Sequence, residues 1–268
     1  MTPSRSSAAA LADPRLAALR AEVRALEQIG RAAERPAVPF GIAGVDDRLA
    51  ACGLAPALHE AAADTLAPGD EAAATLFLAA AAGRFVRAQG GQVLWALARR
   101  DLFAPALAQA GLPPDQVVYA DCRDDAELLA VMEEGLRYGG LAAVVGEVAR
   151  AGMANLRRLQ LGAEDSGTAA LLLRRWRKSG ADPLAAPSPA VTRWRIGCVP
   201  AAPLPYAGLG RACWQVALVR QRGGPPHTWI LEAPDAEARL ALAARSGDRP
   251  DQAHGADRRA AAPPALAA

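Results

Sequence analysis

The sequence predicts an α/β domain built on a largely parallel β-sheet. Short apolar runs with the length of strands occur at 58–61, 92–98, 116–120, 141–149 and 168–174, and helix-like patterns lie between them. Parallel strands must be joined by a crossover, usually a helix, and strands that are covered on both faces read as continuous apolar runs. The alternation therefore predicts three layers, with helices on both faces of the sheet.

The end of the core predicts a different kind of strand pairing. Strand-like runs occur at 194–199, 212–222 and 227–232, and the sequence GGPP at 223–226 separates the last two. Two strands that are joined by a short glycine-containing turn form an antiparallel hairpin. We therefore expect a C-terminal antiparallel hairpin added to the parallel sheet.

The clearest helix of the core begins after Asp124. The Asp124 carboxylate can cap the first turn, and Glu127 can reach back toward it as in a capping box. Gly139 and Gly140 end the helix. The apolar positions that we expect on its buried face are Leu128, Leu129, Val131, Met132 and Leu136.

A separate helix is predicted near the N-terminus. Asp13 followed by Pro14 is a favourable helix start, and the helix is expected to end near Gly30. Its apolar positions repeat every three or four residues, so they form one narrow stripe. The stripe either packs on the chain's own domain or docks onto a second protomer, in a homo-oligomer, or onto another partner. It consists of Leu16, Leu19, Val23 and Leu26.

Three regions are expected along the chain. Residues 1–37 hold the N-terminal helix and a linker, because Pro36 and Pro39 separate that helix from the main body. Residues 38–242 form the core. Residues 243–268 are rich in Ala, Arg, Asp, Gly and Pro without periodicity, so we expect this tail to be disordered.

Composition excludes several classes of protein. The longest apolar run, 72–82, is far shorter than the ~20 residues of a membrane helix, and the first 13 residues lack a secretory signal, so a cytoplasmic location without membrane contact is expected. The four cysteines and three histidines are scattered along the chain. This spacing predicts neither a metal site nor a disulfide framework.

Charge is distributed unevenly. Residues 101–147 contain nine acids and two bases, whereas residues 150–222 contain twelve bases and three acids. Arginines that alternate with tryptophan can hold phosphates and stack on bases, which indicates a candidate surface for DNA or a protein partner; the alternative is a solvated surface with tryptophans packed beneath it. The candidate residues are Arg157, Arg158, Arg174, Arg175, Trp176, Arg177, Lys178, Arg193, Trp194 and Arg195.

The stretch 58–80 has the layout of a phosphate-binding loop, a strand followed by a turn and a helix, but it contains no lysine. Such loops need a lysine for the outer phosphates and a hydroxyl for magnesium. Asp70 and Glu71 instead precede the helix, where they suit the helix dipole and can cap its free amides but would repel a triphosphate. In the strand at 141–149, Gly146 stands where a metal-orienting aspartate is expected, and alternation points Glu147 to the other face. The sequence therefore predicts no working ATP site and no bound cofactor.

The order of elements resembles a RecA-type core and, more narrowly, the ImuA family of bacterial damage-inducible mutagenesis proteins. The most specific segments are "WALARRDLFAP" and "MEEGLR…LAAVVGEV", and the resemblance extends over roughly residues 38–240. It implies a RecA-like three-layer fold with a degenerate phosphate loop. In a superposition on the RecA-type pattern, Ala72, Ala73 and Ala74 fall where Gly, Lys and Thr would be, and Arg99 falls near the position of the catalytic glutamate.

The resemblance also implies a function. ImuA proteins act in the SOS response with ImuB, a relative of lesion-bypass polymerases that looks inactive, and with an error-prone replicative polymerase. The chain is then expected to be a pseudo-ATPase and a non-catalytic accessory protein of translesion synthesis, with RecA and DNA as further candidate partners. Two alternatives are a SulA-like inhibitor of cell division and a working ATPase with a divergent loop.

Overall fold

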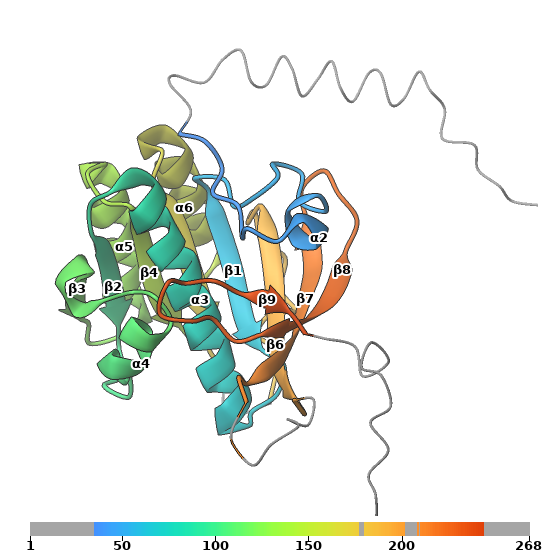
Figure 1. Cartoon of the computed structure of the whole chain (residues 1–268). Helices are drawn as coiled ribbons and strands as arrows, with labels where there is room; N and C mark the ends of the chain where they lie inside the picture. Colours follow the sequence, from blue (N-terminus) through green and yellow to red (C-terminus); the bar gives the residue numbers. More distant parts are fainter. Residues whose placement is uncertain (1–34, 177–179, 202–207, 209, 244–268) are drawn as a thin grey trace, which may run out of the picture.

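A nine-stranded sheet organises the part of the chain that the computed structural model describes, residues 35–176, 180–201, 208 and 210–243 (Figure 1). The strands are β1 (Leu58–Ala63), β2 (Val93–Leu97), β3 (Val117–Asp121), β4 (Ala143–Val148), β5 (Ala169–Arg174), β6 (Thr192–Val199), β7 (Cys213–Gln221), β8 (His227–Glu232) and β9 (Ala241–Leu242). The helices are α2 (Ala43–Asp46), α3 (Pro68–Gln89), α4 (Ala104–Gln109), the 3-10 turn η1 (Pro114–Gln116), α5 (Asp125–Tyr138) and α6 (Met153–Ser166).

The strand order is β3-β2-β4-β5-β1-β6-β7-β8-β9. The strands from β3 to β6 pair in parallel, and those from β6 to β9 pair antiparallel. The predicted parallel sheet and the predicted β7–β8 hairpin are both confirmed, and the arrangement is consistent with a RecA-like α/β fold. The sequence had not indicated α2 or β9, which are too short to show a periodic pattern.

Two apolar layers hold the helices onto the two faces of the sheet. On one face, the long helix α3 packs through Phe77 and Phe85 onto Trp95 of β2 and Trp194 of β6. On the other face, α5 and α6 pack onto β2, β4 and β5. Figure 1 shows α3 crossing the sheet on the side opposite α5 and α6. The three predicted layers are therefore present.

Helix α5 begins and ends where the sequence predicted. The Asp124 carboxylate accepts hydrogen bonds from the amides of Ala126 and Glu127, and Gly139 ends the helix in the left-handed conformation. One detail differs, because the Glu127 carboxylate accepts from the Arg123 amide and not from the capping residue itself. The predicted N-terminal helix with its stripe, and residues 244–268 of the predicted tail, lie outside the described residues.

The chain returns across α3 after β8, and this crossing needs close backbone contact (Figure 1). Arg84 and Arg87 of α3 donate to the carbonyls of Ala238 and Ala236. Gly111, with φ +89°, lies below this segment, and a Cβ there would be 2.2 Å from the Ala238 nitrogen. Only glycine fits this position without displacing the backbone.

We expect Gly111→Ala to lower the free energy of unfolding by about 3 kcal/mol, because it combines left-handed strain with a backbone clash. Gly139→Ala is the matched control, since Gly139 has φ +68° but no atom nearer than 3.9 Å to an added Cβ, so about 1 kcal/mol is expected. Urea unfolding measures both. Equal losses would show that the crossing segment does not constrain Gly111.

A buried hydrogen-bond chain connects β1 to β6. A carbonyl can only accept, so His59 Nε2, 2.7 Å from the Ala55 oxygen, carries the proton, and Nδ1 accepts from the Thr192 hydroxyl. Trp194 Nε1 donates in turn to the same hydroxyl oxygen. Burial lowers the pKa of His59 to about 4, even though the bond to the Ala55 carbonyl acts in the opposite direction. The imidazole is therefore neutral at pH 7.

The lowered pKa of His59 predicts acid sensitivity. Between pH 6.5 and pH 4, His59 is protonated in the unfolded chain but stays neutral in the folded chain. The contribution of His59 to the free energy of unfolding is therefore fully present above pH 6.5 and decreases as the pH falls toward 4. The expected loss from this group is about 3 kcal/mol. Unfolding measured from pH 7 to pH 4 should show a flatter dependence for His59→Gln, and identical slopes would contradict the assignment.

Candidate functional site at the carboxyl ends of the parallel strands

The carboxyl ends of β1, β4 and β5 lie at the first turn of α3. Arg175, immediately after β5, contacts both Glu71 in that turn and Glu147 near the end of β4. In open α/β sheets, ligands bind in the crevice beyond the carboxyl ends of the strands. This junction is therefore the place in the fold where a bound nucleotide would be expected.

Helix α3 begins earlier than the superposition on a phosphate loop assumed. It starts at Pro68, because proline suits a first helical position, so Ala72, Ala73 and Ala74 lie one turn inside it. Ala73 and Ala74 are buried in the layer between α3 and the sheet. The residues of the true first turn are Pro68, Gly69, Asp70 and Glu71.

Asp70 and Glu71 do not cap α3 as predicted. The Asp70 carboxylate accepts hydrogen bonds from the amide and hydroxyl of Thr65 and from the Cys198 amide. Partial burial opposes ionisation of Asp70, but these hydrogen bonds outweigh it and hold the pKa below its usual value. Asp70 thus fastens the turn after β1 to the end of β6.

The Arg175 guanidinium fills the junction. Its Nε and Nη2 atoms donate to Glu147 Oε2 at 3.1 and 2.5 Å, and Nη1 donates to Glu71 Oε2. Trp95 Nε1 donates to the second Glu147 oxygen at 2.7 Å. Burial acts against the charge of Arg175, but attraction to Glu147 and Glu71 outweighs it and raises the pKa. A cation supplied by the chain itself is therefore fixed at the N-terminus of α3.

The prediction for the end of β4 is wrong in its orientation. A Cβ at Gly146 would lie 2.2 Å from Met132 of α5, so Gly146 faces α5. Glu147 consequently faces α3, and only 5% of it is exposed. It is not a solvated residue at a strand end, and it is the acid that points toward the first turn of α3.

A second buried charge cluster lies on the opposite face of the sheet. Glu60 of β1, fully buried, accepts from Arg174 Nη1 at 3.1 Å and from Arg193 Nε at 2.7 Å. Arg174 Nε is buried without a hydrogen-bond partner among the described residues. One carboxylate therefore serves two guanidinium groups. The sequence signal was available, because Glu60 is the one charged residue in the short strand LHEAAA and a buried charge needs partners.

The tryptophans among the candidate residues are also engaged inside the protein. Trp194 lies within 6.2 Å, between ring centroids, of each of Phe40, Phe77 and Trp229. Trp176 is partly buried, and its Nε1 donates to the Ala63 carbonyl. The Trp194 indole is therefore closed to a base, and the hydrogen-bond donor of the Trp176 indole is already used inside the protein.

The expectation that Arg174, Arg175, Arg193 and Trp194 belong to an exposed surface is therefore not met. Each is less than 9% exposed, and the three arginines form ion pairs with buried acids. The reason is the strand register, which places each of the three arginines beside an acid of a neighbouring strand. Arg193 lies directly opposite Glu60. Arg174 and Arg175 lie two residues after the β5 positions that are opposite Glu60 and Glu147. Charge counts along the sequence could not reveal these pairs.

The remaining candidates are dispersed. Arg195 binds both oxygens of Asp182 at 2.8 Å, Arg158 pairs with Glu133 at 2.8 Å, and Arg157 is exposed on α6. Arg177 and Lys178 lie outside the described residues.

Arg99, expected near the position of a catalytic glutamate, is exposed and paired with Asp101. Within the described ranges, no three His, Cys, Asp or Glu side chains come together as a metal site. No helix in the same ranges has the length and apolar character to span a membrane.

Comparison with known proteins adds a relative that covers most of the chain. Over 215 residues the chain is 34% identical to "Protein ImuA" of Caulobacter vibrioides (strain NA1000 / CB15N), a match that covers 78% of this chain and 88% of the relative. Protein ImuA of strain ATCC 19089 / CIP 103742 / CB 15 gives the same identity and coverage. No protein-family model matches the chain.

We expect Arg175→Met to lower the free energy of unfolding by about 3–5 kcal/mol, because it leaves Glu147 buried without its cation. The double variant Arg175→Met/Glu147→Gln should recover part of this loss, since it also removes the orphaned charge. Arg157→Met, on the exposed face of α6, is the control and should stay within about 0.5 kcal/mol of the unaltered protein. Denaturant unfolding measures all three, and a neutral effect of Arg175→Met would contradict the buried ion network.

Proposed function

The chain belongs to the ImuA family, and on that premise we propose that it is a non-catalytic accessory protein of SOS-induced mutagenic translesion DNA synthesis. In this proposal it acts with an ImuB-like polymerase homologue and an error-prone replicative polymerase. RecA and DNA are further proposed partners. The chain's role is to assemble these proteins at damaged DNA and not to hydrolyse a nucleotide.

The filled junction at the start of α3 carries the non-catalytic part of the proposal. A phosphate loop holds the anion with free amides, a lysine and a magnesium ligand. Here Glu71 and Glu147 place negative charge where phosphates would lie, and the one cation, Arg175, is shared between the two acids, so the three groups keep a net charge of −1. A nucleotide would have to displace buried ion pairs to enter, which supports a pseudo-ATPase.

Direct contact with DNA, if the chain makes it, rests on fewer cations than the sequence suggested. Arg174, Arg175 and Arg193 are committed to internal ion pairs. The residues that still support a DNA or partner surface are the exposed Arg157 and Arg158 on α6, together with Arg177 and Lys178 of the sequence after β5; Arg195 is held by both oxygens of Asp182. Substituting Arg174 or Arg175 would damage the fold, so those variants cannot test this surface.

The proposal is tested by damage-induced mutagenesis in a bacterial host from which the corresponding gene is deleted. The deletion should lower the frequency of mutations after ultraviolet irradiation, and the unaltered chain should restore it, because the polymerases need their accessory protein. The ImuB-like protein should co-purify with the chain from irradiated cells. Titration of the purified chain with a fluorescent ATP analogue should show no saturable binding with a Kd below about 1 mM.

Two outcomes would contradict the proposed function. Saturable ATP binding with hydrolysis would restore the divergent-ATPase alternative. A block of cell division without any effect on mutation frequency would favour the SulA-like alternative.

For the DNA surface, Arg157→Ser/Arg177→Ser/Lys178→Ser should reduce both the affinity for single-stranded DNA and the slope of that affinity against salt, and unchanged values would remove DNA contact.

A further inference from the structure

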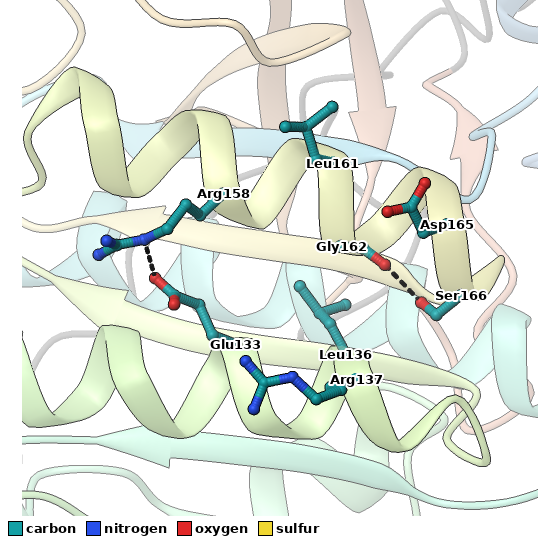
Figure 2. Close-up of a pocket in the computed structure, with 8 residues that line it drawn as sticks. All are labelled: Glu133, Leu136, Arg137, Arg158, Leu161, Gly162, Asp165 and Ser166. Atoms are coloured by element: carbon teal, nitrogen blue, oxygen red, sulfur yellow. Dashed lines mark hydrogen bonds and ion pairs between the residues drawn. The ribbon is translucent and has the colours of Figure 1, made fainter.

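A cleft of about 420 Å³ lies between α5 and α6, on the outer side of the helical layer (Figure 2). Two leucines line it: Leu136 of α5 is fully buried at the base, and Leu161 of α6 is 57% exposed. Gly162 adds no side chain, so the base stays open beside Leu136. Leu161 lies at the rim of the cleft, on the outer side of α6, and nothing in the described chain covers it.

Charged groups surround this apolar strip. Glu133 and Arg158 form an ion pair across the cleft, as Figure 2 shows, while Arg137 and Asp165 lie nearer the C-terminal ends of the two helices. The cleft thus combines a narrow apolar strip with charges of both signs along its sides. A helix with one narrow apolar stripe and mixed charges beside it matches this pattern.

The described chain starts at one end of the cleft. Arg35 donates to the carbonyls of Gly139, which ends α5, and of Leu141, and to Gln89 Oε1. Its side chain also lies against Gly167, which ends α6. Residues 1–34 must therefore leave from the C-terminal ends of both cleft-forming helices.

The length of the preceding segment fits the cleft. The helix predicted over residues 14–29 would be about 24 Å long, and α5 and α6, with 14 residues each, are about 21 Å long. Five residues, 30–34, join it to Arg35 and can span at most about 17 Å. Two other exposed apolar side chains, Phe103 and Leu66, follow β2 and β1 at the carboxyl ends of the strands, beyond the reach of this short connection. Tyr138, which is 75% exposed, is the last residue of α5 and lies at the same end of the cleft as Arg35.

We propose that residues 14–29 of the same chain occupy the α5–α6 cleft as a third, parallel helix. The stripe of Leu16, Leu19, Val23 and Leu26 then covers Leu161 and closes the cleft above the buried Leu136. In this direction Glu27 lies toward Arg137 and Arg20 lies toward Glu133, so the flanking charges are complementary. The docked helix buries a stripe that would otherwise stay exposed. This docking does not depend on the proposed role in mutagenesis.

Cross-linking tests which chain fills the cleft. In full-length protein with the two exposed cysteines replaced, Cys52→Ser and Cys198→Ser, the pair Val23→Cys/Leu161→Cys is treated with a short bismaleimide. The expected product is a monomer that contains one internally linked peptide. The control pair Val23→Cys/Ile230→Cys uses an exposed apolar position on β8, 41% exposed against 57% for Leu161, and should give no such product. A linked dimer would show that a second copy fills the cleft, and an absence of linkage would show that residues 14–29 do not; either result overturns the proposal.

Hydrogen exchange tests the same contact without cysteines. Val23→Arg should increase amide exchange several-fold in α5 and α6 near the cleft, because the cover is lost. Ala21→Arg is the matched control, since Ala21 lies on the side of the predicted helix opposite the stripe, and it should leave exchange unchanged. Equal exchange in the two variants would overturn the proposal even if both fold normally.

Discussion

The Arg175 guanidinium, held between Glu147 and Glu71, is the interaction on which the junction of sheet and helix depends. Three elements meet there, because Glu147 belongs to β4, Glu71 to α3, and Arg175 directly follows β5. Removing charges from water costs several kcal/mol per ion, so such a group is tolerated only with complete partners. The hydrogen bond from Trp95 to the second Glu147 oxygen completes the set. The start of α3 is thereby fixed relative to the carboxyl ends of two strands.

The same requirement explains what becomes of the basic segment. On the other face of the sheet, Glu60 is fully buried and takes two guanidinium partners, Arg174 and Arg193. Three arginines that the sequence assigned to a contact surface thus form ion pairs with two buried acids: Arg174 and Arg193 with Glu60 on one face of the sheet, and Arg175 with Glu147 on the other. An excess of bases along the sequence does not become an excess on the surface when neighbouring strands supply the acids. The electrostatic reach of this protein toward a polyanion is accordingly smaller than its sequence suggested.

Local patterns predicted most of the fold. The strands, helix α5 and the β7–β8 hairpin were found because strand length, helical periodicity, the Asp124 cap and a glycine turn are all properties of neighbouring residues. The side to which Glu147 points was missed because alternation gives two faces but not which helix covers each one. The ion pairs were missed for a similar reason, since Arg193 and Glu60 become neighbours only through strand order and register. Glu60 alone, a charge inside an apolar strand, carried a readable signal.

A cation that belongs to the chain differs from one that arrives with a ligand. In nucleotide-driven proteins, switching follows from a ligand that binds one conformation more tightly than another, so its departure shifts the population. At this junction the charges belong to Glu71, Glu147 and Arg175, so they are present in every molecule whether or not a ligand is bound. A ligand that entered at the start of α3 would first have to separate Arg175 from Glu71 and Glu147. The face of the sheet that α5 and α6 cover carries a buried cluster of its own, Glu60 with Arg174 and Arg193, so repacking on either face has to preserve buried ion pairs.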